Sequence, residues 1–193
     1  MSETLHDAAG RRKYLTATER SRFLTAAEAA DRETRTLCLT LAYTGCRLSE
    51  ALALTADRVD LAERSVVFES LKKRRRGHYR IVPVPGEVID ALDLVHDLRA
   101  VQRSNRAVIT RLWPWSRETG WRRVTAVMRR AEILGPHATP KGLRHTFGVQ
   151  AVASGVPLNL VQRWLGHAQL STTAIYADAQ GAEARQIAER MWA

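Results

Sequence analysis

The hydrophobic pattern of this chain changes period in one place, and this change limits the fold class. The runs RSVVFESL (64–71) and YRIVPVP (79–85) are short and rich in β-branched residues, and a basic turn that contains Gly77 separates them. Two such runs around a short turn predict an antiparallel β-hairpin. Pro83 and Pro85 favour an edge strand or a strand end, because proline cannot donate a hydrogen bond to the ladder.

Helical patterns lie on both sides of this hairpin. Thr16 and Glu19 have the spacing of a capping box at the start of the first helix. Apolar periodicity and helix-ending residues predict helices over residues 14–30, 31–45, 47–54, 86–102, 117–134, 140–154, 157–165 and 182–192. The predicted fold class is therefore mainly α with a small antiparallel β-sheet (α+β). We expect a flexible polar tail over residues 1–13 and one domain over residues 14–193.

The charge balance favours a polyanionic partner. Lys and Arg number 30 and Asp and Glu 20, so the formal net charge is +10. Such an excess is typical of nucleic-acid binding, although a basic housekeeping protein rich in Arg and Ala is the alternative.

Cysteine usage and hydropathy bound the compartment. Cys38 and Cys46 form no CxxC pair, so we expect reduced thiols and neither a zinc site nor a disulfide framework. No apolar run reaches the roughly 18 residues that a membrane span needs, and the N-terminus shows no signal-peptide pattern. These features predict a cytoplasmic or nucleoid protein.

The segment TGCRLSE (44–50) places an arginine directly after a helix end. Arg47 follows the helix-ending Gly45, where its planar fork can form bidentate bonds to a phosphate. The alternative is a surface arginine paired with Glu50.

The segment LKKRRRGHYR (71–80) concentrates positive charge on the predicted hairpin turn. Six of its ten residues are basic and none is acidic. A basic hairpin tip can track DNA phosphates, whereas the alternative is a solvated charged turn. The candidate DNA-binding residues here are Lys73, Arg74, Arg75, Arg76 and Arg80.

The segment TPKGLRHTFG (139–148) predicts a helix N-terminus suited to an anion. Thr139 fits the N-cap and Pro140 the first helical position. Lys141 and Arg144 are three residues apart, so both face the same side near the positive end of the helix dipole. His145 would point away from Arg144, and we expect it to be a buried hydrogen-bonding residue.

The segment LGHAQLSTTAIYAD (165–178) contains His167 and, nine residues later, Tyr176. A tyrosine hydroxyl is a poor nucleophile near neutral pH, since its ordinary pKa is about 10. Positive groups around it and around its target would help it attack phosphorus. The alternative is an aromatic side chain packed in the core.

Together, these four segments resemble, in order and spacing, the tyrosine recombinase (phage integrase) family, over about residues 14–180. The resemblance implies that Arg47 and Arg144 clamp the scissile phosphate, with Glu50 supporting the first arginine. By the same resemblance, His167 hydrogen-bonds the phosphate and Tyr176 is the nucleophile. Lys72 matches the lysine that protonates the leaving 5′ oxygen, with Lys73 as the competing candidate.

Two departures from the family pattern stand out. The family segment that matches TPKGLRHTFG usually has a histidine three residues before its arginine, and Lys141 occupies that position here. A lysine provides a fixed positive charge, or a proton shuttle if its pKa is lowered. Typical members also place a helical core-binding domain before the catalytic domain, and this chain resembles a catalytic domain without one.

The resemblance implies a site-specific recombinase that forms a 3′-phosphotyrosine link and needs no metal, ATP or other cofactor. The implied partners are double-stranded DNA recombination sites, a homo-tetramer on DNA, and accessory DNA-bending proteins or a second recombinase. The apolar stripe of the last predicted helix packs on its own core or docks into a neighbouring subunit. Three alternatives remain: a relaxing enzyme like the type IB topoisomerases, a truncated, non-catalytic integrase that binds DNA, and an unrelated basic helical binding protein. The sequence does not specify the target site or the kind of rearrangement.

Overall fold

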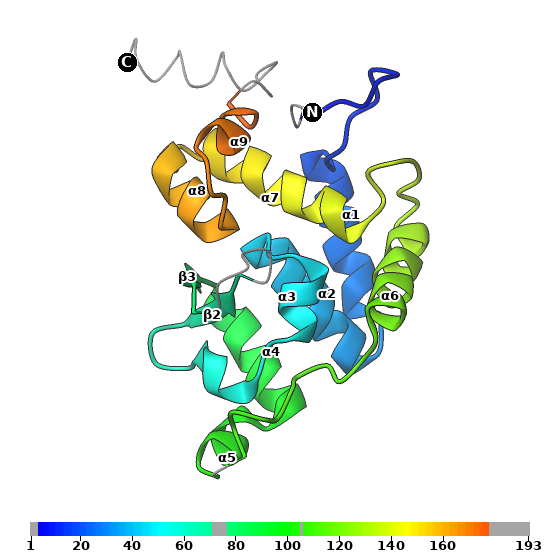
Figure 1. Cartoon of the computed structure of the whole chain (residues 1–193). Coiled ribbons are helices and arrows are strands. Elements are labelled where there is room, and N and C mark those ends of the chain that lie inside the picture. Colours follow the sequence, from blue (N-terminus) through cyan, green and yellow to red (C-terminus); the bar gives the residue numbers. More distant parts are fainter. Residues whose placement is uncertain (1–3, 71–76, 105, 178–193) are drawn as a thin grey trace, which may run out of the picture.

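The computed structural model describes residues 4–70, 77–104 and 106–177. Most of this part of the chain is helical, and a small sheet lies beside the central helices (Figure 1). In chain order the elements are α1 Ala17–Glu28, α2 Arg32–Thr44, α3 Leu48–Leu52, the 3-10 turn η1 Ala56–Arg58, β1 Val59–Asp60, β2 Ser65–Glu69, β3 Tyr79–Pro83, α4 Gly86–His96, α5 Leu98–Gln102, α6 Arg117–Arg130, α7 Pro140–Ala153, α8 Leu158–Leu165 and α9 Ser171–Ala174. The predicted fold class is confirmed.

The sheet contains the predicted hairpin. Strands β2 and β3 pair antiparallel, with Val67 opposite Ile81, and β1 adds to the free side of β2. The order β1-β2-β3 leaves β3 at an edge, as its prolines predicted. Strand β1 was not predicted, because two residues are too few to show an alternating pattern. The hairpin turn at 71–76 lies outside the described residues.

Local sequence signals set most helix ends. Thr16 and Glu19 form the predicted capping box at the start of α1. The Thr139 side chain accepts a hydrogen bond from the backbone N–H of Gly142, which caps α7 as expected. Gly45 ends α2 with a φ of 60°, a left-handed conformation that glycine adopts without strain.

Two predicted helices end earlier than expected. The helix predicted over 86–102 divides at Asp97, whose φ of 50° is left-handed. The Asp93 carboxylate accepts a hydrogen bond from the backbone N–H of Arg99, and the bend directs Leu98 into the core. The helix predicted over 117–134 ends at Arg130, because Glu132 also has a positive φ. The helix predicted over 182–192 lies outside the described residues.

Apolar side chains form two separate cores. The larger core contains side chains from the helices α1 through α6 and from the sheet. Its fully buried members include Phe23, Leu37, Phe68 and Trp113. The smaller core lies at the other end of the molecule, where α8 and α9 sit against α7 (Figure 1). Its buried members among the described residues are Leu5, Val149, Ala151, Val161, Leu165 and Tyr176.

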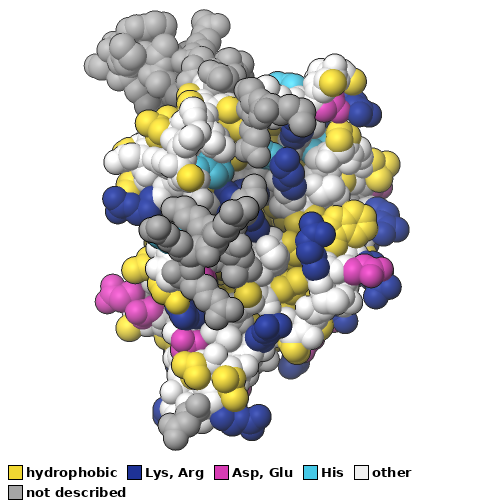
Figure 2. All heavy atoms as spheres, viewed as in Figure 1, with side chains coloured by type: hydrophobic (Ala, Val, Ile, Leu, Met, Phe, Trp, Pro, Cys, Tyr) yellow, Lys and Arg dark blue, Asp and Glu magenta, His cyan; other side chains and the backbone are white. Residues whose placement is uncertain are grey.

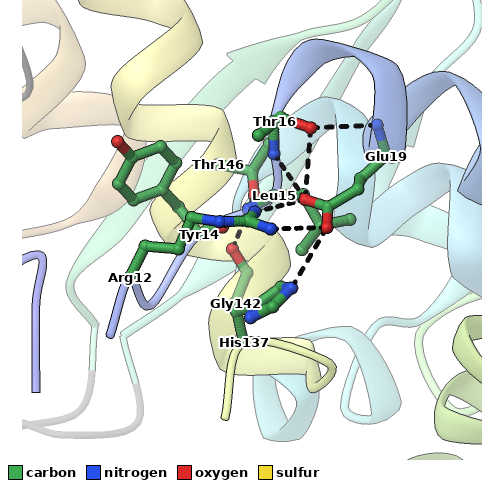
Figure 3. A network of polar contacts seen from close by, with 8 residues as sticks. All are labelled: Arg12, Tyr14, Leu15, Thr16, Glu19, His137, Gly142 and Thr146. Carbon is green, nitrogen blue, oxygen red and sulfur yellow. Dashed lines mark hydrogen bonds and ion pairs between the residues drawn. The ribbon is translucent and has the colours of Figure 1, made fainter. Parts of the chain in front are cut away.

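The N-terminal segment packs against α7, which differs from the loose tail that we expected. Leu5 is buried in the smaller core, and its carbonyl accepts a hydrogen bond from the backbone N–H of Lys13. The Arg12 guanidinium pairs with the Glu19 carboxylate, which also faces His137 in the loop before α7 (Figure 3). Defined contacts therefore hold residues 4–13 in place.

Candidate active site

A cavity of about 870 Å³ opens between the two cores. Arg47, Lys141, Arg144, His167 and Tyr176 all line it. Lys and Arg side chains, together with histidine, are visible on this side of the molecule in the space-filling view (Figure 2). Three of the four sequence segments therefore supply residues to one site. The remaining segment has its basic residues Lys72 to Arg76 outside the described part of the chain.

Arg144 joins elements from both cores at the floor of the cavity. Its two terminal nitrogens donate hydrogen bonds to the carbonyls of Gly45 and Leu165, each at 2.8 Å. These carbonyls belong to the C-terminal ends of α2 and α8. Burial, followed by repulsion from Arg47, lowers the pKa of Arg144 to about 10, so the guanidinium stays charged near neutral pH. The result is a fixed cation within the cavity wall.

Arg47 begins α3 and is held by Glu50. Its guanidinium donates to the Glu50 carboxylate at 2.7 Å, and its backbone N–H donates to the other carboxylate oxygen at 2.8 Å. Burial opposes ionisation of Glu50, but the positive charges of Arg80 and Arg47 hold its pKa below the ordinary value. The arginine–glutamate pair of the alternative interpretation is therefore present, and it aims Arg47 into the cavity.

His167 follows the end of α8, where Gly166 has a left-handed conformation. Its Nδ1 lies 2.9 Å from the hydroxyl of Thr173, and its ring stacks on Tyr176 with 6.2 Å between ring centroids. Burial, then repulsion from Arg144 and Arg47, lowers the pKa of His167 to about 3. The imidazole is therefore neutral near pH 7.

Tyr176 is almost fully buried, with 2% of its surface exposed. Its hydroxyl lies 3.3 Å from Nδ1 of His145, which confirms the prediction that His145 is a buried hydrogen-bonding residue. The tyrosine ring rests on Gly148, where an added Cβ would lie 2.6 Å from it. Because His145 and Gly148 are three residues apart on α7, they share the helix face that receives Tyr176.

Sequence reasoning missed this contact between the segments 139–148 and 165–178. The spacing of His145 and Gly148 was visible, but nothing local identified Tyr176 as the residue they meet. We also expected His145 to point away from Arg144, yet both line the cavity. Neighbouring side chains on a helix are only about 100° apart, so a wide cavity reaches both.

The remaining basic candidates divide into exposed and buried residues. Lys141 is exposed at the start of α7, on the cavity wall. The side chain of Arg80 is only 5% exposed and is paired with Glu50. This buried position differs from the exposed DNA-contacting position that we expected for Arg80. Arg117 and Trp121 were not predicted, and they reach the cavity from one face of α6. Their spacing of four residues was the available signal.

No metal site is present in the described part of the chain, where no group of three or more His, Cys, Asp or Glu side chains is placed to hold an ion. Cys38 and Cys46 are both buried and free, and burial raises the pKa of each thiol. Within the same residues, no helix combines the length and the apolar character that crossing a bilayer requires.

Comparison with known proteins identifies the class to which this fold and site belong. The sequence pattern of the phage integrase family matches residues 13–183. This match covers most of the chain, so the protein belongs to the phage integrase family.

Individual relatives agree with this assignment. Tyrosine recombinase XerD of Mycobacterium tuberculosis (strain CDC 1551 / Oshkosh) is 36% identical over 140 residues, which cover 69% of this chain and 43% of XerD. The crystal structure of XerA recombinase superposes with a TM-score of 0.75 at 29% identity, covering 92% of this chain and 64% of that one. The XerH site-specific recombinase bound to its difH substrate has the same fold, with a TM-score of 0.73 at 20% identity. The match covers 97% of this chain and 60% of the XerH chain. The chain thus spans less than half of the XerD relative.

Proposed function

We propose that this protein is a tyrosine-type site-specific DNA recombinase that cleaves and rejoins DNA through a 3′-phosphotyrosine intermediate. The supporting observation is that Arg47, Arg144, His167 and Tyr176 line a single cavity. Family membership over residues 13–183 supports the same chemistry. Integration, excision and inversion of a DNA element all use this reaction.

The two arginines are proposed to bind the non-bridging oxygens of the scissile phosphate. Phosphoryl transfer depends mainly on positioning and on neutralising charge, which two fixed guanidinium groups supply. His167 is neutral, and the Thr173 hydroxyl occupies its Nδ1. With Thr173 donating to Nδ1, the Nε2–H of His167 is free to donate a hydrogen bond to the phosphate.

Tyr176 is the proposed nucleophile. Its hydroxyl gives up its proton as the oxygen bonds to phosphorus, the bond from phosphorus to the 5′ oxygen breaks, and that oxygen leaves as a hydroxyl after taking up a proton. A 5′ hydroxyl from the partner duplex then attacks the phosphotyrosine and reverses the step. Because the phosphate ester bond is conserved in the tyrosine link, the proposed reaction needs no ATP, metal or other cofactor.

Proton transfer involves lysines in this proposal. Lys72, or Lys73 in its place, protonates the leaving 5′ oxygen, as the family resemblance implies. Lys141 stands at the cavity wall as a positive charge where the family usually has histidine.

The Tyr176 hydroxyl faces His145, so it has to leave this contact to reach a phosphate. Tyrosine repositioning on DNA binding is therefore part of the proposed cycle.

The proposed partners are duplex recombination sites and further subunits. XerH is described in complex with its difH DNA substrate, and the net charge of +10 supports DNA as the partner here. We place the protein on the nucleoid and expect a homo-tetramer on DNA, with accessory bending proteins or a second recombinase as further partners. Deleting residues 182–193 is expected to impair pairing of sites more than cleavage.

A trapping experiment tests the proposed chemistry. The protein is incubated with nicked duplexes tiled across the DNA that flanks its own gene, and adducts that resist SDS are measured. We expect an adduct from wild type and from Tyr43→Phe, whose hydroxyl lies outside the cavity beside Glu87. Tyr176→Phe is expected to bind the same DNA without forming an adduct. Salt-dependent binding with no adduct from any variant would instead support a non-catalytic DNA-binding protein.

A further inference from the structure

Arg80 occupies an unusual place for a residue from a basic hairpin. It lies on the inward face of β3, where the exposure of successive residues alternates. Its side chain is 5% exposed. One terminal nitrogen donates to the Glu50 carboxylate at 2.6 Å, and its Nε donates to the carbonyl of Trp164 at 2.7 Å. A buried guanidinium with two strong acceptors is a fixed part of the structure.

Glu50 connects Arg80 to the first arginine of the site. The carboxylate is fully buried, and it accepts from Arg47 as well as from Arg80. The bond to Arg80 therefore helps to fix the position of the carboxylate to which Arg47 binds. Without Arg80, a buried carboxylate would have one cationic partner in place of two, and Arg47 would be drawn toward it and away from the cavity.

The Trp164 carbonyl connects Arg80 to the second arginine and to His167. Trp164 and Leu165 are consecutive, and their carbonyls accept from Arg80 and Arg144 respectively. Two buried arginines therefore bind the last turn of α8, directly before Gly166 and His167.

Gly166 fits closely against this arrangement. An added Cβ at Gly166 would lie 3.2 to 3.3 Å from the side chain of Arg80, and the backbone φ there is +70°. Glycine at this point both forms the left-handed helix end and leaves room for the guanidinium. The chain turns toward His167 directly over Arg80.

We propose that Arg80 is a positioning residue for the phosphate-binding groups of this site. It holds Arg47 through Glu50 and holds the end of α8, with His167, through the Trp164 carbonyl. This inference rests on the proposed function. It assigns Arg80 to holding the groups that bind the scissile phosphate; Arg80 itself neither contacts DNA nor takes part in protonation of the leaving group by the neighbouring hairpin.

The test compares variants on two nicked substrates that differ in one atom. One has the natural 5′ bridging oxygen, and the other has sulfur there, which leaves without needing a proton. Arg80→Met removes the charge and both bonds, whereas Arg80→Lys keeps a charge beside Glu50. Arg58→Met is the matched control, because Arg58 stacks on Tyr79 of the same strand without reaching Glu50. Cleavage rates are measured at saturating DNA, and affinity is measured separately.

We expect Arg80→Met to cleave about 100-fold more slowly than wild type on both substrates, a loss comparable to removing a group that stabilises the transition state. DNA affinity should be retained, Arg80→Lys should recover part of the rate, and Arg58→Met should match wild type. If Arg80→Met does not fold, Arg80→Lys carries the test, with a loss of about tenfold expected on both substrates.

Two results would overturn the proposal. Restoration of the rate by the sulfur substrate would mean that Arg80 acts through the leaving-group acid. A wild-type rate in the folded variants would mean that its role is structural only. Failure of the proposed function is distinguishable, since wild type itself would then form no adduct on either substrate.

Discussion

The larger and smaller cores contribute different parts of the site. Arg47 and Glu50 belong to α3, which packs on α6 and the sheet within the larger core. His167 and Tyr176 belong to the last described part of the chain, where six of the described residues form the buried smaller core. Within the described residues, the proposed phosphate-binding Arg47 therefore rests on the larger apolar support, and the proposed nucleophile rests on the smaller one.

This difference suits the proposed reaction. Groups that neutralise phosphate charge act best when they are fixed before the substrate binds. A nucleophile that starts buried against His145 has to move, and elements with few buried apolar contacts open at low free-energy cost. Helix α7 extends between the cores, with Leu143 in the larger one and Val149 in the smaller one. Arg144 lies on α7 where the two meet.

Removing Arg144 is expected to have the largest effect, because it separates the two halves of the site. Arg144→Ala leaves the carbonyls of Gly45 and Leu165 without their donor, which should lower the free energy of unfolding by about 2–4 kcal/mol. Cleavage should fall by about 100-fold or more. Urea unfolding and single-turnover cleavage measure the two effects. Arg130→Ala, at an exposed position on α6, is the control and should change neither.

Gly148→Ala perturbs the smaller core alone. The new Cβ meets the Tyr176 ring, so the ring has to shift. We expect cleavage at saturating DNA to change by about tenfold or more while DNA affinity stays constant. Gly86→Ala, where the added Cβ makes only ordinary contact with Arg64, is the control. A wild-type cleavage rate for Gly148→Ala would show that the buried position of the ring does not govern the reaction.

Hydrogen exchange measures the difference between the cores directly. Amides of α8 are expected to exchange with a lower opening free energy than amides of α2, which is buried along most of its length. The protein is studied without DNA under conditions where exchange reports local opening. Equal protection of the two helices would contradict the comparison.

The smallest expected effect is on acid stability. Burial lowers the pKa of His167 in the smaller core to about 3 and that of His96 in the larger core to about 4, from an ordinary value of 6.5. The unfolded chain therefore binds protons first, and stability that is complete above pH 6.5 is lost as the pH falls toward these values. His167→Gln and His96→Gln should each make the unfolding free energy less dependent on pH between 6.5 and 4. An unchanged slope in both variants would show that other groups control the acid transition.

Sequence patterns predicted the fold where the signal was local. The hairpin, the capping box of α1 and the Thr139 cap of α7 each depend on neighbouring residues, and the structure confirms them. The bend at Asp97 was missed, because it depends on the burial of Leu98, a tertiary effect. The packing of Leu5 was missed for the same reason, since the other buried members of its core lie between Val149 and Tyr176.

For the candidate site, too, local sequence signals were predictive and tertiary effects were not. The sequence identified Arg47, Arg144, His167 and Tyr176, and these residues line one cavity. It did not distinguish Arg80 from the other basic residues of its segment, because a charge run gives no information on which side chain turns inward. The alternation of β3 was the available signal, since Val82 and Arg80 share the buried face.

The most direct measurement of the central claim is the chemical identity of the protein–DNA link. A trapped adduct is digested with nuclease and protease, and the modified peptide is sequenced by mass spectrometry. We predict a nucleotide joined through its 3′ phosphate to Tyr176, with a free 5′ hydroxyl on the other DNA strand end. A nucleotide attached to any other residue, or attached through a 5′ phosphate, would contradict the account.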